Sequence, residues 1–177
     1  MSVVRVVLFV LALLAGALSA GFFYTFSILI MPALATADAG TAILAMQKIN
    51  LSVRTPLFAF AFFGAPALAL LVAMFAGLAG HRRAAWLAFV SGLLQIGAVF
   101  AVTMLVNVPL NEALAPVAAS GPTAAATWAG YDARWTPWNH VRAVGAAVSF
   151  LFLLAAFASD VVAARRGRSL AGHPIGA

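Results

Sequence analysis

The nine residues RWTPWNHVR, from Arg134 to Arg142, concentrate most of the chemistry that this sequence offers. They hold two arginines, two tryptophans, an asparagine and a histidine, whereas the remaining chain is mostly Ala, Leu, Val, Phe and Gly. Asn139 and Arg142 are three residues apart, so they share one face of a helix. An arginine and an amide at a helix end can receive an anion, and His140 can act as a base near neutral pH.

The element that must position these side chains is a membrane-spanning helix. Thr136 is a good N-cap and Pro137 suits the first turn, so we predict that the helix begins there. The free N–H groups of that end would add positive charge to the anion site. Trp138 lies four residues before Arg142, which predicts stacking of the guanidinium on the indole.

A charge one turn inside a span usually has a partner. Glu112 is the expected carboxylate partner of Arg142, and Asp132 is the competitor. Arg134, by contrast, is expected to reach the lipid headgroups.

Composition identifies the class of protein. Of the 177 residues, 65% are hydrophobic and 8% are charged, against about 25% charged in soluble domains. Continuous apolar runs long enough to cross a hydrocarbon core of about 30 Å cover residues 3–30, 56–80, 84–106 and about 138–164. Because open sheet edges find no partner in lipid, these runs predict an all-α bundle of four transmembrane helices.

The basic residues indicate orientation in the membrane. The net charge is +6, and arginines flank the apolar runs at Arg5, Arg82, Arg83, Arg165, Arg166 and Arg168. This pattern predicts an integral protein of a bacterial-type inner or plasma membrane with both termini in the cytoplasm. We therefore expect membrane lipid as a partner and no nucleic acid; the sequence does not indicate an oligomeric state.

One domain is predicted over residues 1–165, followed by a basic, flexible cytoplasmic tail over 166–177. Two long loops, about 31–55 and 107–137, are expected on the outer side. They are candidates for the functional part of the protein, because loops carry function more often than the elements they join. Each loop is expected to contain a short helix. One covers residues 41–54, and the other is capped by Asn107 with Pro109 in its first turn.

Several kinds of chemistry are excluded or disfavoured. The chain has no cysteine, which rules out disulfides and thiolate chemistry. His140 is the only histidine expected on the outer side, no metal-binding spacing of histidines occurs, and His81 and His173 are expected to be solvated. We therefore predict no metal site and no cofactor. The four apolar runs contain neither a charged pathway nor paired broken helices, so a secondary transporter is disfavoured.

An aromatic pocket at the outer mouth of the bundle fits the remaining residues. Its predicted binding residues are Phe23, Tyr24, Asn107, Asn111, Trp128, Trp135 and Trp138. Such a mixture of aromatic walls and few polar groups suits a flat, apolar small molecule. The alternative for Trp128 and for Tyr131 is an aromatic belt at the membrane surface.

Four segments resemble a known family. They are GFFYTFSILIMPAL at 21–34, AMQKIN at 45–50, NVPLNEAL at 107–114, and the pattern WxxYxxxWxxWNHVR from Trp128 to Arg142. Together they are similar to the DUF1772, or anthrone oxygenase-like, membrane proteins. The resemblance implies a four-helix membrane protein, and some fungal members are assigned to anthrone oxidation.

Two functions stay open at this point. In the first, the protein is a cofactor-independent oxygenase of anthrone-like or other flat phenolic compounds. His140 would be the base, Arg142 and Asn139 would stabilise the oxyanion, and Asn107, Asn111 and Tyr24 would orient the substrate. In the second, the motifs form a structural cap on a non-enzymatic module that binds lipid, quinone or a partner protein. An open cavity lined by Arg142, Asn107 and Asn111 would favour the first. Saturation of all three by protein partners, with no cavity, would favour the second.

Overall fold

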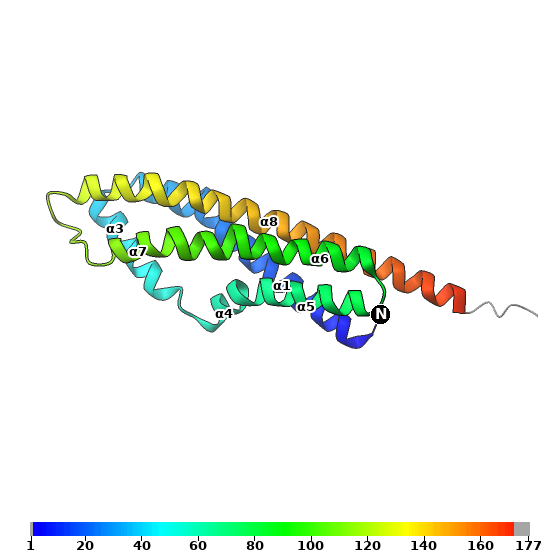
Figure 1. Ribbon diagram of the computed structural model, residues 1–177. Coiled ribbons are helices and arrows are strands. Elements are labelled where there is room, and N and C mark those ends of the chain that lie inside the picture. Colours follow the sequence, from blue (N-terminus) through cyan, green and yellow to red (C-terminus); the bar gives the residue numbers. More distant parts are fainter. Residues whose placement is uncertain (1, 172–177) are drawn as a thin grey trace, which may run out of the picture.

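The chain forms a bundle of four long, antiparallel helical segments (Figure 1). The computed structural model describes residues 2–171. Each segment is long and apolar enough to cross a membrane, and the four cover Val3–Ala35, Pro56–Leu78, Arg82–Leu114 and Ala124–Arg166. The predicted all-α architecture, with short helices in its loops, is therefore confirmed, and the chain is an integral membrane protein.

Most spans combine α-helix with short π-helical turns. The first span contains α1 (Val3–Thr25), η1 (Phe26–Ile30) and α2 (Met31–Ala35), and α3 (Ala39–Ser52) follows it. The second contains α4 (Pro56–Ala59), η2 (Phe60–Gly64) and α5 (Ala65–Leu78). The third contains α6 (Arg82–Leu94), η3 (Gln95–Ala101), η4 (Thr103–Asn107) and α7 (Val108–Leu114). The fourth is a single helix, α8 (Ala124–Ala171).

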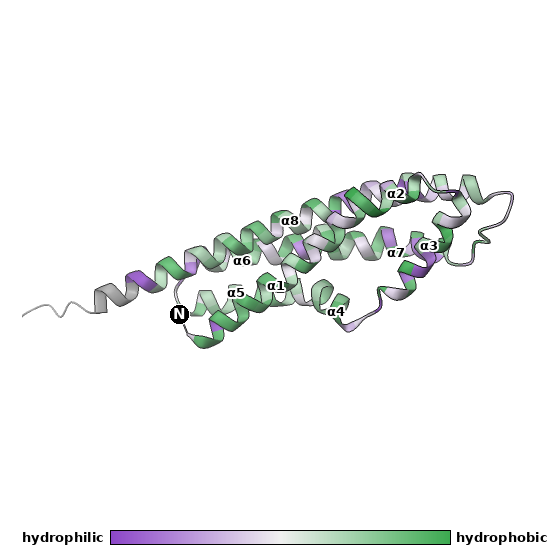
Figure 2. Ribbon diagram, turned by 180° about the vertical axis from the view of Figure 1, so that it is seen from behind, coloured by the Kyte–Doolittle hydropathy of each residue, from purple (hydrophilic) through white to green (hydrophobic). Residues whose placement is uncertain are grey.

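The spans pack as a ring in which α1 and α6 each contact both α5 and α8. Small buried residues such as Ala12, Ala69 and Ala146 allow the helices to approach closely. Large apolar side chains, including Leu14, Leu71 and Leu151, are exposed on the outside of the ring. Figure 2 shows hydrophobic residues along these helices and hydrophilic residues near their ends. The outer surface therefore contacts membrane lipid.

The π-helical turns in the third span set which side chains face the interior. Ser91, Gln95, Val99, Thr103 and Asn107 follow each other at intervals of four and are all buried. In an α-helix, residues four apart rotate by about 40° relative to each other. Because π-helical turns contain more residues, η3 and η4 remove much of this drift. Thr103 and Asn107 consequently face α8. Such turns often occur at functional sites.

A cap of short helices covers one end of the bundle, which we call the loop end. Here α3, α7 and the start of α8 enclose a cluster of buried apolar residues: Met31, Ile43, Met46, Leu114, Trp128, Tyr131 and Trp135. Trp128 and Tyr131 are only 7% and 3% exposed, so the alternative of an aromatic belt is wrong for both. Asp38 begins α3 by accepting a hydrogen bond from Thr41, and this bond lowers the pKa of the Asp38 carboxyl.

Gln47 ties α3 to the end of α7. Its Nε2 donates to the carbonyl oxygens of Leu114, Ala115 and Val117 at 2.9, 3.2 and 3.0 Å, which lack partners within their own helix. We expect Gln47→Leu to cost about 1 to 3 kcal/mol, because it leaves these carbonyls unpaired. Hydrogen exchange should then accelerate in α3 and α7. The exposed neighbour Lys48 supplies the control, Lys48→Leu; equal exchange in both variants would contradict the assignment.

One predicted helix start is wrong, and a second lacks its predicted cap. Pro137 lies inside α8, and the helix does not begin at Thr136. Asn107 likewise makes no capping bond, because η4 continues directly into α7. A proline removes one backbone bond, but the buried face of α8 continues from Trp135 to Arg142 and holds the helix together. As a result, the N–H groups of a helix start are not available beside Arg142.

The opposite end, which we call the termini end, holds the start of α1, the α5–α6 turn and the last turns of α8 (Figure 1). Arg5 Nη1 lies 3.2 Å from Asp160 Oδ1, and His81 Nδ1 contacts the same oxygen. His81 was expected to be solvated and instead joins a buried cluster; His173 lies outside the described residues. The predicted tail at 166–177 begins within α8, and residues 172–177 also lie outside the described part.

Candidate functional site

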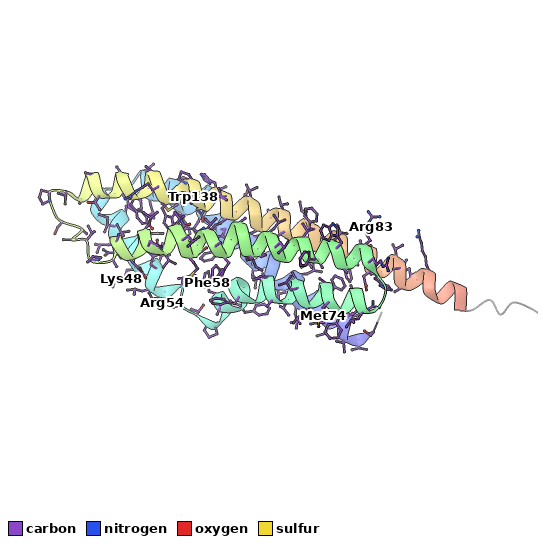
Figure 3. The ribbon with its side chains drawn as sticks, viewed as in Figure 1. Lys48, Arg54, Phe58, Met74, Arg83 and Trp138 are labelled. Carbon is purple, nitrogen blue, oxygen red and sulfur yellow. The ribbon has the colours of Figure 1, made fainter. Side chains whose placement is uncertain are left out.

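A cavity of about 840 Å³ lies at the loop end, between α3, α4, η2 and the third span. Its size is within the range of about 300 to 1,000 Å³ that small-molecule sites have. Its walls are largely aromatic and include Phe22, Phe23, Phe26, Phe58, Phe62 and Trp135. Its polar lining includes Lys48, Asn50, Arg54, Asn111, Glu112 and Arg142. Figure 3 shows Lys48, Arg54 and Phe58 on the side where α3 meets α4. We call this space the Arg142 cavity.

Arg142 lies between two aromatic rings. Its guanidinium carbon is 4.7 Å from the ring centroid of Phe23 and 4.8 Å from that of Trp135. The side chain is only 4% exposed, so both cation–π contacts are shielded from solvent. Trp138, the predicted stacking partner, is 43% exposed and lies on the far side of the bundle from Lys48 and Phe58 (Figure 3). The guanidinium plane is therefore fixed by the bundle interior.

The polar partners of Arg142 are all neutral. Nη1 donates to Thr103 Oγ1 at 3.2 Å, and Nη2 donates to Asn139 Oδ1 at 2.9 Å. Nε is buried and finds no hydrogen-bond partner within residues 2–171. A buried charge is costly unless it is paired. This arginine thus keeps an unused donor and a positive charge beside a large cavity.

The predicted carboxylate partners of Arg142 do not pair with it. In every ion pair found in the described part of the chain, the acidic partner is Asp160. Asp132 accepts a hydrogen bond from Thr136 on its own helix. Glu112 lines the same cavity as Arg142 but is exposed and forms no ion pair with it. Arg142 therefore has no carboxylate partner among the described residues.

Asn139 positions Arg142 and does not itself line the cavity. Its Nδ2 donates to the Phe23 carbonyl at 3.0 Å and to Ser27 Oγ at 2.8 Å, while its Oδ1 accepts from Arg142. The residue is completely buried. Because these bonds join the first span to the fourth, Asn139 holds the guanidinium between Phe23 and Trp135.

Two further asparagines hold the Trp135 ring. Asn111 Oδ1 accepts from Tyr131 Oη at 2.7 Å and from Trp135 Nε1 at 2.8 Å. Asn107 Nδ2 donates to the Trp135 carbonyl at 3.2 Å, and Asn107 Oδ1 is buried without a partner in the described chain. Of these two side chains, Asn111 lines the cavity and Asn107 stands behind its wall. Both fix the aromatic surface that covers Arg142.

The remaining predicted site residues lie outside the cavity. His140 is exposed, and its Nδ1 shares a hydrogen bond of 2.9 Å with Ser27 Oγ. Tyr24 is 56% exposed. Trp128 is buried in the cap, where its ring stacks on Tyr131. The structure therefore brings Phe23, Asn111, Trp135 and Arg142 together, and His140 as a base stays a prediction without support from its position.

Thr103, Phe58 and Phe62 also line the cavity, although they were not predicted from the sequence. The series of polar or small residues at intervals of four from Ser91 to Asn107 is the sequence feature that could have identified Thr103. Phe58 and Phe62 had no signal beyond an apolar run rich in phenylalanine. No group of three His, Asp or Glu residues that could hold a metal ion occurs among the residues described.

Comparison with known proteins gives one result. The sequence model of the family described as anthrone oxygenase matches residues 57–152. This range covers the second span from its second residue, the whole third span and the segment from Trp128 to Arg142. No curated protein and no solved structure matches the chain.

Proposed function

The chain belongs to the anthrone oxygenase family, and from this premise we propose that it is a membrane enzyme that oxidises flat phenolic compounds with O₂ in the Arg142 cavity. One observation carries the proposal. Arg142 is buried between two aromatic rings beside a cavity of about 840 Å³, with neutral hydrogen-bond partners only. A flat molecule with an acidic enol or phenol supplies both the missing negative charge and an aromatic surface.

The chemistry starts with an acidic C–H bond. Loss of a methylene proton converts an anthrone into an anthracenolate, whose negative oxygen would lie against Arg142. This electron-rich anion reduces O₂, and a C–O bond forms at the carbon that lost the proton. Loss of water from the resulting peroxide gives the quinone, so anthrone and O₂ become anthraquinone and H₂O. The substrate itself supplies the electrons, and we propose that no cofactor takes part.

We propose Glu112 as the proton acceptor. It is the acidic residue that lines the Arg142 cavity, and its exposed position lets the proton leave to water. A general base must reach the proton that it removes. His140, the base predicted from the sequence, does not line the cavity and instead contacts Ser27.

A matched pair of variants tests this assignment. Oxygen uptake by the purified protein is recorded with 1,8-dihydroxyanthrone. We expect Glu112→Gln to lower kcat by about 10² to 10⁴-fold, the contribution of a general base, and His140→Ala to leave kcat near that of the parent. The reverse result would return the role of base to His140. No uptake above the spontaneous rate in the parent would overturn the proposed function.

A second candidate function rests on asparagines that are hydrogen-bonded within the protein. Asn111 and Asn139 make hydrogen bonds within the protein, as the structural cap requires. In that case the Arg142 cavity binds a quinone or lipid without turnover. Binding of 1,8-dihydroxyanthraquinone with no oxygen uptake from the anthrone would favour this candidate. For either function we propose cytoplasmic termini, because Arg5, Arg82 and Arg165 gather at the termini end.

A further inference from the structure

A second, smaller cavity of about 270 Å³ lies between α1 and the α4–η2 segment. Leu18 and Ser19 line it from α1, and Leu57 and Ala61 line it from the second span. Leu18 and Leu57 are 36% and 66% exposed. Because they lie on the outside of the bundle, this cavity opens toward the surface that contacts lipid.

The depth of the smaller cavity follows from the length of the spans. About 20 helical residues cross the hydrocarbon core. Counted from Arg5, about 20 residues end near Phe26, and counted back from Leu78 they end near Phe58. Ser19 and Ala61 therefore lie inside the hydrocarbon, in the half nearer the loop end. On its α1 side, at Leu18, the cavity faces acyl chains, and Leu57 lies at the edge of the hydrocarbon.

The two cavities are neighbours with a common wall. Both are lined by Phe22, Phe23, Val53, Thr55, Phe58 and Phe62. Within this wall, the rings of Phe22 and Phe58 face each other across the gap between the spans, with centroids 5.1 Å apart. Only side-chain contact joins these two rings, and side chains change rotamer far faster than helices move. The partition between the cavities is consequently a movable one.

Ser19 is the buried polar residue of the smaller cavity, whose other polar residues, Ser52 and Thr55, are exposed. It is 2% exposed, and its Oγ has no hydrogen-bond partner in the described chain. A buried hydroxyl normally bonds to a partner, often the carbonyl one turn earlier in its helix. Ser19 thus offers a hydrogen bond to a phenol or ketone that passes it, and its small side chain leaves room for a flat ring.

From these observations we propose that the smaller cavity is the bilayer-side entrance to the Arg142 cavity. Flat, uncharged aromatic molecules dissolved in the membrane would pass between α1 and α4, past Ser19, and displace the Phe22–Phe58 pair. They would become anions only beside Arg142, since a charged molecule is poorly soluble in hydrocarbon. The identity of the ligand rests on the proposed function, whereas the route does not.

Fluorescence quenching by 1,10-dibromodecane tests the route. This probe is confined to the bilayer of proteoliposomes and quenches tryptophan on contact. Trp135 lines the Arg142 cavity and is 3% exposed, so its quenching reports passage from the lipid. The Trp135 contribution is the difference between the parent and Trp135→Phe, so a single substitution isolates the signal.

We expect dibromodecane to quench Trp135 in the parent, several-fold more in Phe58→Ala, and less in Ser19→Leu, which fills the passage. Phe75→Ala is the matched control, because Phe75 lies on α5 and lines neither cavity. Quenching of Trp135 by aqueous acrylamide alone, or equal quenching in Phe58→Ala and the parent, would overturn the proposal. If Ser19→Leu fails to fold, these two outcomes still decide it.

Failure of the route and failure of the proposed function give different results. Dibromodecane carries no oxyanion, so its quenching of Trp135 does not require turnover. An intact quenching pattern without anthrone oxidation would reject the proposed function and keep the passage. Anthrone oxidation without quenching from the lipid would reject the passage and keep the proposed function.

Discussion

Replacing Arg142 by methionine is expected to lower kcat/KM for oxygen uptake with 1,8-dihydroxyanthrone by about 10² to 10³-fold, the loss that follows removal of one oxyanion-stabilising donor. Methionine fills similar space between Phe23 and Trp135 but offers neither charge nor N–H. The Kd of the anthraquinone anion should rise as well, because the same group would hold its oxygen.

The stability of this variant should change in the opposite sense to its activity. A buried guanidinium has lost its hydration, and replacing buried charge with apolar groups of similar volume is often neutral or stabilising. Arg142→Met is therefore expected to unfold at or above the temperature of the parent. A structural cap predicts instead that stability falls together with binding, because Thr103 and Asn139 lose their partner.

Two further arginine variants separate charge from geometry. Arg142→Lys keeps the charge, but a single ammonium group cannot reproduce the fork that reaches both Thr103 and Asn139, so most of the loss should remain. Arg134→Met is the control, since Arg134 is exposed and bonds only to the Gly130 carbonyl of its own helix. A folded Arg142→Met that oxidises the anthrone at the parental rate would remove Arg142 from the site.

The four spans could be predicted because their signal is local. A run of about 20 apolar residues is sufficient to identify a membrane helix, and its position needs no knowledge of neighbours. The helix boundaries at the loop end depend on neighbours. Thr136 and Pro137 have the residue types of a helix start, yet the buried face that joins Trp135 to Asn139 keeps α8 continuous. Tertiary packing there outweighs the local preference.

The central residue of the site could also be predicted, while its partner Thr103 could not. Arg142 stood out because a charge within a span is costly and therefore serves a purpose. Its contacts come from three different spans: Phe23 from the first, Thr103 from the third and Asn139 from the fourth. The inward direction of Thr103 depends on the π-helical turns of the third span. No residue type there predicts such turns.

Neighbouring residues on α8 show why the position of His140 could not be predicted from its sequence. Asn139 and His140 are separated by about 100° around the helix. Asn139 is completely buried while His140 is exposed. Residue chemistry favoured both equally, and only the packing of α8 against α1 decides which one faces the interior.

The second large effect is expected at the termini end. Asp160 is completely buried and accepts a hydrogen bond from Arg5, whose side chain is 10% exposed, and it also contacts His81. These three residues join α8, α1 and the α5–α6 turn. Asp160→Leu removes the only carboxylate that Arg5 contacts within the described residues. We expect a loss of about 3 to 5 kcal/mol in the free energy of unfolding, the cost of leaving one buried charge unpaired.

Titration of the folded protein with SDS, followed by helical circular dichroism at neutral pH, measures this loss. Asp132→Asn is the matched control, because the Asp132 carboxylate bonds only to Thr136 one turn away and lies far from the termini end. The double variant Arg5→Met/Asp160→Leu should recover much of the stability, since it removes both charges together. If Asp160→Leu unfolds like the control, or the double variant loses the sum of both single effects, the cluster does not hold the helices together through its charges.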